Sequence, residues 1–118
     1  MQYMLSFYEQ NSEIERRQDP EQAPIYWSAW NAYVKSIAES GIMVSGNGLE
    51  MPSNGTFVSI QNGKRVIQDG PYPDTKEHLG GYFIIEVKDL DEALEWASRS
   101  PNAQAGRTEI RPVLPKPE

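Results

Sequence analysis

Apolar residues along the chain change their spacing from strand-like to helix-like and back, and this alternation predicts the order of the elements. Residues 3–8 are apolar or aromatic at nearly every position, which predicts a buried strand. Residues 9–24 are polar and interrupted by prolines, so we expect a connection there; alternatively it holds a helical turn around Ile14 to Arg17. Residues 25–40 predict a helix that ends before Gly41. Its apolar stripe follows the i, i+3, i+4, i+7, i+8 spacing and consists of Trp30, Tyr33, Val34, Ile37 and Ala38.

The second half of the chain predicts more strands and one further helix. Asn62-Gly63 suits a two-residue type I′ turn, so residues 56–68 predict a hairpin. Asp89 and Glu92 have capping-box spacing and predict the start of a helix. The glycines at 46 and 48 predict a turn. The remaining predicted strands are residues 42–45, 82–87 and 108–113, the last of which ends near an edge-favouring proline.

This order, β-α-β, then a hairpin, then β-α-β, predicts a single α+β domain over residues 1–118. We expect a ferredoxin-like antiparallel sheet with two helices on one face and an inserted β-hairpin. The strands at 3–8 and 82–87 are apolar on both faces, yet two helices can cover only one of them. Leaving the other face in water would be unfavourable, so we expect a homodimer in which two sheets face each other across a two-fold axis.

Composition excludes several classes of function. The net charge of −6, without a window rich in Lys or Arg, argues against nucleic acid and anionic membranes as partners. The chain has no cysteine, which excludes disulfides, thiolate nucleophiles and Cys-based metal sites. The first residues lack the pattern of a signal peptide, and we expect a cytoplasmic protein. No motif for a cofactor or metal is present, so neither is expected.

The stretch from Asp69 to Tyr82 is the candidate site, because it concentrates turn-forming and polar residues between two apolar strands. Asp69 is a candidate general base; alternatively its side chain accepts backbone N–H groups in an Asx-type turn. His78, the only histidine, is a candidate proton shuttle; alternatively it is a surface residue on a one-turn helix. Asp74 and Glu77 have the spacing to cap such a turn, and Gly80-Gly81 would end it.

Further residues are candidates for binding a planar organic ligand in a cleft beside this stretch. Lys76 could orient an anionic group, or form a solvated pair with Glu77. The aromatic candidates could instead serve only core and dimer packing. The ligand-binding candidates are Trp27, Gly70, Pro71, Tyr72, Lys76 and Tyr82.

The motif Asp69-Gly-Pro-Tyr72 resembles that of the YCII-related proteins, in the branch named for an Asp-Gly-Pro-Phe motif. Tyr72 stands in place of the phenylalanine of that motif. The resemblance covers nearly the whole chain and includes Leu79-Gly-Gly-Tyr82, Asp89-Leu-Asp-Glu-Ala93 and Glu109-Ile-Arg-Pro-Val113.

The resemblance implies a dimeric α/β barrel. It also implies that some relatives are dehydrochlorinase-like or isomerase-like enzymes with a His–Asp pair, whereas others are associated with sigma factors. The family's histidine lies on the first helix, which here reads Trp27-Ser-Ala-Trp-Asn-Ala-Tyr33 and has none.

Two hypotheses follow. The first is a small-molecule enzyme or binder with its cleft at the Asp69–Tyr82 connection and lyase-type or isomerase-type acid–base chemistry at Asp69. The second is a non-catalytic dimeric module that contacts a regulatory protein.

Overall fold

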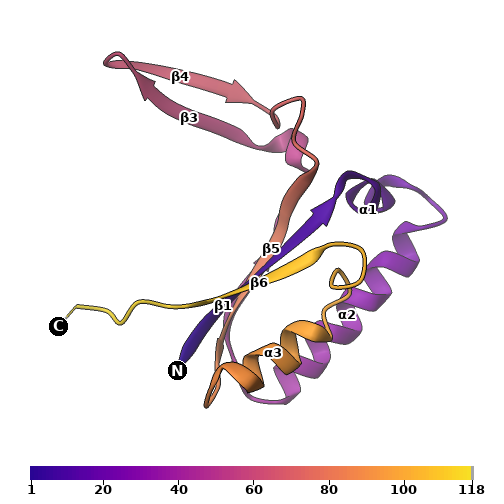
Figure 1. Ribbon diagram of the computed structural model, residues 1–118. Helices are drawn as coiled ribbons and strands as arrows, with labels where there is room; N and C mark the ends of the chain where they lie inside the picture. The colour runs from indigo at the N-terminus through magenta and orange to yellow at the C-terminus, as the bar shows by residue number, and fades with distance from the viewer. Residues whose placement is uncertain (118) are drawn as a thin grey trace.

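The computed structural model describes residues 1–117, which form a four-stranded sheet, a separate two-stranded sheet and three α-helices (Figure 1). Across these residues, no helix combines the length and the apolar character that crossing a membrane requires. The strands are β1 Gln2–Gln10, β2 Met43–Gly48, β3 Thr56–Gln61, β4 Lys64–Asp69, β5 Glu77–Glu86 and β6 Arg107–Pro112. The helices are α1 Asn11–Glu15, α2 Ala23–Glu39 and α3 Leu90–Ser98, with short 3-10 turns at Arg16–Gln18 and Pro52–Asn54.

The main sheet has the strand order β2-β5-β1-β6, and each neighbouring pair is antiparallel. This arrangement fits the ferredoxin-like fold and confirms the predicted α+β class with an inserted hairpin. β1 lies at the centre, where Leu5 faces Phe83 of β5 on one side and Ile110 of β6 on the other. Pro112 ends β6, which is an edge strand, so its missing N–H disrupts no ladder.

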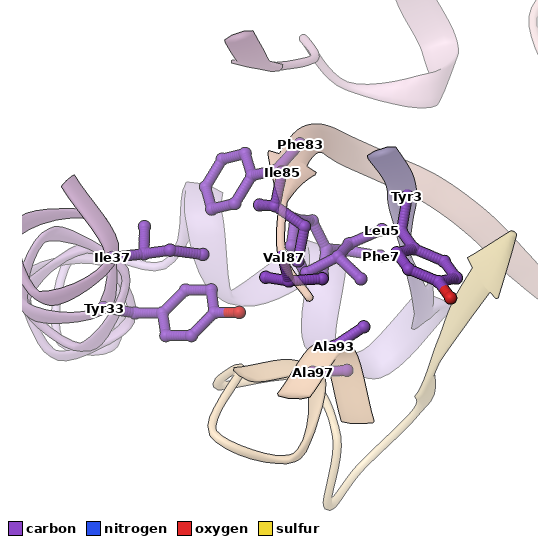
Figure 2. Close-up of a cluster of buried hydrophobic side chains, with 10 residues drawn as sticks. All are labelled: Tyr3, Leu5, Phe7, Tyr33, Ile37, Phe83, Ile85, Val87, Ala93 and Ala97. Atoms are coloured by element: carbon purple, nitrogen blue, oxygen red, sulfur yellow. The ribbon is translucent and has the colours of Figure 1, made fainter. Parts of the chain in front are cut away.

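Helices α2 and α3 pack on the same face of the main sheet and enclose the core (Figures 1 and 2). Leu5, Ile37 and Ile85 are fully buried there. The Phe7 ring meets the Phe83 ring edge-on, with 4.9 Å between centroids. The core cluster consists of Tyr3, Leu5, Phe7, Tyr33, Ile37, Phe83, Ile85, Val87, Ala93 and Ala97.

Both long helices agree with the sequence prediction. In α3 the Asp89 side chain accepts a hydrogen bond from the backbone N–H of Glu92 at 2.9 Å, as the capping-box spacing indicated. The hairpin turn is also confirmed, because Asn62 and Gly63 have φ values of 53° and 74°, the conformation of a type I′ turn. Residues 9–24 contain α1 and the 3-10 turn that follows it, which agrees with the alternative of a helical turn around Ile14 to Arg17.

Two local predictions were wrong. The one-turn helix expected near Asp74 is absent, because β5 already begins at Glu77 and runs through both glycines. Glu77 and His78 pair across to β1, and this ladder outweighs a short-range capping pattern. Gly80 is the extra residue of a bulge between Phe7 and Tyr8.

The turn expected at Gly46-Asn-Gly48 is instead the second half of β2. Those residues pair with β5, where Gly48 lies opposite Gly81.

The face of the main sheet opposite α2 and α3 carries apolar side chains that remain partly exposed. Strand alternation assigns these residues to that face, because their neighbours in sequence point into the core. We call this the open sheet face; its apolar residues are Met4, Tyr8, Leu79, Tyr82 and Ile84. The dimeric barrel that would cover it remains a prediction.

We predict that Ile37→Ala lowers the free energy of unfolding by about 2–5 kcal/mol, because it removes a fully buried side chain from the core. The neighbouring change Ser36→Ala, at an exposed position of the same helix, should change it by less than about 0.5 kcal/mol. Urea unfolding measures both. Similar losses for the two variants would contradict the assignment of this helix face to the core.

Candidate functional site

The predicted acid–base residues, Asp69 and His78, lie in different sheets. Asp69 ends β4 in the hairpin, where its Oδ1 lies 3.3 Å from Oγ1 of Thr56, the residue opposite it in β3. His78 lies in β5 of the main sheet. Each side chain has its own partner, so the structure does not bring them together as a catalytic pair.

His78 lies in a strand and not on the one-turn surface helix that the sequence predicted. It is buried in a strand, and its Nε2 lies 2.7 Å from Oδ1 of Asn11, the first residue of α1. The Asn11 backbone N–H also donates to the carbonyl of Lys76 at 3.2 Å, so α1 is attached to the start of β5 at two points. The expectation of a surface histidine on a short helix was therefore wrong, and the observed role of the ring is to join α1 to β5.

A cavity of about 560 Å³ lies at the base of the hairpin. Predicted ligand-binding Pro71 and predicted His78 contribute to its wall, whereas the Tyr72 ring lies tilted against the Phe57 ring, with 5.2 Å between centroids. We call this the hairpin cleft; it is lined by Leu49, Glu50, Met51, Pro52, Asn54, Gly55, Thr56, Phe57, Pro71, Thr75, Glu77, His78 and Leu79. Gly70, at φ 74°, makes the turn that leads into it, and its N–H donates to the carbonyl of Gly55 at 2.7 Å.

A buried charged cluster that the sequence interpretation missed lies near the cleft. Glu9 ends the buried part of β1, and its carboxylate accepts a hydrogen bond from the Tyr26 hydroxyl, which lies 2.6 and 2.8 Å from the two oxygens. Arg17 donates from Nε to the Tyr26 hydroxyl at 3.0 Å, and its terminal nitrogen lies 3.4 Å from Glu9. In the sequence, this cluster could have been found from Glu9 and Arg17, which lie on either side of a helical turn, just before the aromatic start of α2.

Arg17 also ties the backbone of two other segments to this cluster. It donates to the carbonyl of Leu49 at 2.6 Å and to that of Gly80 at 3.3 Å. Its side chain is only 8% exposed; the bond to Gly80 is partly buried, whereas the bond to Leu49 lies at the surface. Because the opposite charge of Glu9 is also buried, the pair is compensated and its polar atoms are satisfied.

Burial, and next the hydrogen bond with Glu9, raise the pKa of Tyr26 well above its ordinary value. The hydroxyl therefore stays protonated and acts as a fixed donor to Glu9. In this state Tyr26 orients the carboxylate, and the carboxylate in turn orients Arg17.

A second, smaller cavity of about 140 Å³ lies beside Arg17, between α2 and the ends of β2 and β5. Its floor contains the cross-strand pair Gly48 and Gly81, which supply no side chain to fill the space beneath the helix. Trp27, a predicted ligand-binding residue, belongs to this cavity, and the Arg17 guanidinium lies 5.1 Å from its ring centre. We call it the aromatic cavity; it is lined by Phe7, Arg17, Tyr26, Trp27, Trp30, Asn31, Val34, Asn47, Gly48, Gly80, Gly81 and Phe83.

Two other predicted ligand-binding residues lie apart from the aromatic cavity. The hydroxyl of Tyr82 accepts a hydrogen bond from the Asn47 side chain at 3.1 Å on the open sheet face. Lys76 lies next to α1. Within residues 1–117, His, Asp and Glu side chains do not gather in threes as a metal site would require.

We predict that Tyr26→Phe lowers the free energy of unfolding by about 1–3 kcal/mol, because Glu9 and Arg17 both lose a hydrogen-bond partner in a buried site. The matched change Tyr72→Phe, at a half-exposed ring, should cost less than about 0.5 kcal/mol. Chemical denaturation gives both values. Equal stabilities of the two variants would show that the cluster is not a structural constraint.

Stability should also fall at alkaline pH. Burial raises the pKa of both Tyr26 and Tyr33 in the folded state, so the unfolded chain releases these protons first. The stabilising contribution is complete below the unfolded pKa of about 10 and decreases as the pH rises beyond it. Between about pH 9 and 11.5, the free energy of unfolding, measured by chemical denaturation, should fall less steeply for Tyr26→Phe than for the wild type. An equally steep fall in both proteins would refute the raised pKa of Tyr26.

The chain was compared with known proteins after these features were defined. The model of the YCII-related domain matches residues 1–116. An uncharacterised protein of Rhizobium meliloti (strain 1021) is 43% identical over 53 residues, which span 43% of this chain and 43% of that protein.

A solved structure with the same fold is that of the 5-chloro-2-hydroxyhydroquinone dehydrochlorinase TftG from Burkholderia phenoliruptrix AC1100, in complex with 2,5-dihydroxybenzoquinone. It has a TM-score of 0.54 and 15% identity, over 97% of this chain and 94% of that one. Because the family model matches residues 1–116 of the 118 residues of the chain, the chain belongs to the YCII-related domain family.

Proposed function

We propose that the protein binds a small organic molecule built on a single ring, in the aromatic cavity between α2 and the glycine pair of β2 and β5. The observation that carries this proposal is the absence of side chains at Gly48 and Gly81, directly beneath a helix that presents Trp27 and Trp30. In an ordinary core, side chains would fill this space. Here the space is open and walled by aromatic rings.

The size of the cavity supports a ligand with one ring. An apolar cavity of about 150 Å³ holds benzene, and the aromatic cavity measures about 140 Å³. Phe7, Trp30 and Phe83 supply flat apolar walls against which a planar ring can stack or pack edge-on. A bicyclic ligand would need the walls to move apart.

The polar groups of the cavity favour an oxygen-bearing ring. Arg17 carries five N–H donors, and the cluster with Glu9 and Tyr26 holds its plane in place beside the cavity. Since Glu9 already compensates the positive charge, a neutral carbonyl or hydroxyl oxygen suits this position as well as an anion does. The ligand class is therefore a hydroxylated or quinone-like ring.

The structural neighbour supports the same class. TftG has the same fold, and its structure contains 2,5-dihydroxybenzoquinone, a single six-membered ring with oxygen substituents. That ligand is consequently the first probe to test.

The predicted cleft at the Asp69–Tyr82 connection is refined by this proposal. Gly80 and Gly81 of the connection border the aromatic cavity, whereas Pro71 and His78 border the hairpin cleft. Asp69, the predicted general base, is exposed at the base of the hairpin, so we expect binding of the ring to be independent of its carboxylate. The fold and the comparisons add no support for the other expectation, a module that contacts a regulatory protein.

We predict binding of 2,5-dihydroxybenzoquinone with a Kd near 0.2 mM, from about ten atoms at roughly 0.5 kcal/mol each. The variant Gly48→Val should weaken it at least about tenfold, because its side chain enters open space in the cavity and meets no atom within 4 Å at its Cβ. Isothermal titration calorimetry measures the affinity. Phenol and 4-hydroxybenzoate extend the panel of ring compounds.

The control is Ser45→Val, the same new side chain in the same strand but on the open sheet face. It should bind as the wild type does, as should Asp69→Asn. Wild-type affinity of Gly48→Val, or absence of binding by all of these ring compounds at millimolar concentration, would overturn the proposal. Loss of binding in Asp69→Asn alone would move the site to the base of the hairpin.

A further inference from the structure

Asn31 is a polar side chain on the helical wall of the aromatic cavity. It follows Trp27 by four residues in α2, so the two side chains are neighbours on one face of the helix. Both are exposed, which puts them at the opening of the cavity and not at its glycine floor. Within residues 1–117, the side chains of α2 that form hydrogen bonds are Tyr26 and Tyr33, so the amide of Asn31 is free to bind a ligand.

The guanidinium of Arg17, in contrast, is almost fully occupied. Its Nε donates to the hydroxyl of Tyr26 at 3.0 Å, and its Nη1 donates to the carbonyl of Leu49 at 2.6 Å. Its Nη2 donates to the carboxylate of Glu9 at 3.4 Å and to the carbonyl of Gly80 at 3.3 Å. Since a guanidinium has five N–H groups, the bonds within the described residues leave a single N–H, on Nη1. Arg17 can therefore hold one oxygen of a bound ring, and a second oxygen needs another partner.

Asn31 is the side chain best suited to be that partner. The amide of Asn47 donates to the hydroxyl of Tyr82 on the open sheet face and so points away from the cavity. The indole N–H groups of Trp27 and Trp30 can donate but cannot accept. A hydroxyl group on the ring carries a proton that needs an acceptor, and the carbonyl oxygen of the Asn31 amide supplies one. Asn31 therefore favours a hydroxyl as the second oxygen.

The spacing along α2 indicates where on the ring the second oxygen lies. The guanidinium of Arg17 lies 5.1 Å from the ring centre of Trp27, and Asn31 follows Trp27 by about 6 Å along the helix axis. Two oxygens on neighbouring ring carbons lie within hydrogen-bond distance of each other, which is too close together to reach both groups. Two oxygens on opposite carbons are separated by the width of the ring. The spacing therefore favours oxygens in the para arrangement.

We propose that Asn31 determines the specificity of the aromatic cavity, by accepting a hydroxyl on the ring carbon opposite the oxygen that Arg17 holds. The ligand class is accordingly a para-dioxygenated ring with at least one free hydroxyl. This inference rests on the proposed binding of a ring in the cavity, and it adds which arrangement of oxygens is selected. The far end of the cavity, at Val34 and Phe83, is apolar and suits the unsubstituted edge of the ring.

Hydroquinone and catechol test the proposal, because they have the same composition and differ only in the position of the second hydroxyl. Phenol, with one hydroxyl, gives the reference affinity. In titrations of isotope-labelled protein under nitrogen, followed by the NMR signals of the Gly48 and Gly81 amides, all three should bind. Hydroquinone should bind about three- to tenfold more tightly than catechol or phenol, the gain expected from one additional hydrogen bond.

Two variants assign this preference to Asn31. In Asn31→Leu, which replaces the amide by an apolar group of similar size, hydroquinone should bind only as well as phenol, and phenol should bind as it does to the wild type. Asn31→Ala, which cannot narrow the opening of the cavity, should behave in the same way. The control Ser28→Leu, at an exposed position of α2 outside the cavity, should keep the full preference.

The outcomes separate this inference from the proposed function. Equal affinities of hydroquinone and catechol for the wild type, or a preference that persists in both Asn31 variants, would overturn the role of Asn31 and leave ring binding intact. Absence of binding by all three compounds would overturn the proposed function, and the role of Asn31 with it.

Discussion

The side chain of Arg17 is the constraint on which the arrangement of β1, α2, β5 and the segment after β2 depends. Its guanidinium donates to Tyr26 of α2, to the carbonyl of Leu49 after β2 and to that of Gly80 in β5, and it pairs with Glu9 of β1. Four segments distant in sequence are thereby held around one buried cation. Removing one partner would leave a charge without compensation, which is far more costly than the pair itself is stabilising. The cluster therefore fixes the geometry of the aromatic cavity at its side.

Glycine provides the space that Arg17 borders. A Cβ at Gly81 would lie 2.9 Å from the carbonyl of Asn47, and a Cβ at Gly80 would lie 3.0 Å from both Arg17 and Glu9. At Gly81, β5 can approach β2 closely because there is no side chain to meet the Asn47 carbonyl. The absence of side chains at Gly81 and Gly48 also leaves the floor beneath α2 empty. On the other side of the sheet, partly exposed apolar residues and a projecting hairpin remain without cover in the single chain. The proposed ligand site thus lies on the helix-covered face, and the predicted homodimer would bury the other face.

Sequence patterns predicted those parts of the fold that local interactions determine. The helices, the Asp89 cap and the Asn62-Gly63 turn all depend on residues within a few positions of one another. The predicted start of β5 was wrong. The spacing of Asp74 and Glu77 is a local pattern that favoured a helical turn, whereas the pairing of His78 with Glu9 joins residues far apart in the sequence. The cavity could not be predicted for the same reason: its floor joins Gly48 to Gly81, and its polar group joins Arg17 to Glu9, Leu49 and Gly80. Of the predicted ligand-binding residues, only Trp27 lies in this cavity.

The central claim is that the space between α2 and the glycine pair is a binding site for a single oxygen-bearing ring. A crystal structure of the protein grown with 2,5-dihydroxybenzoquinone tests this most directly, because it locates the ring without reference to any variant. The account predicts density for a flat ring between Trp27 and Gly48, with one ring oxygen within hydrogen-bond distance of the Arg17 guanidinium. Density for the ring in the hairpin cleft, with the aromatic cavity empty, would contradict it.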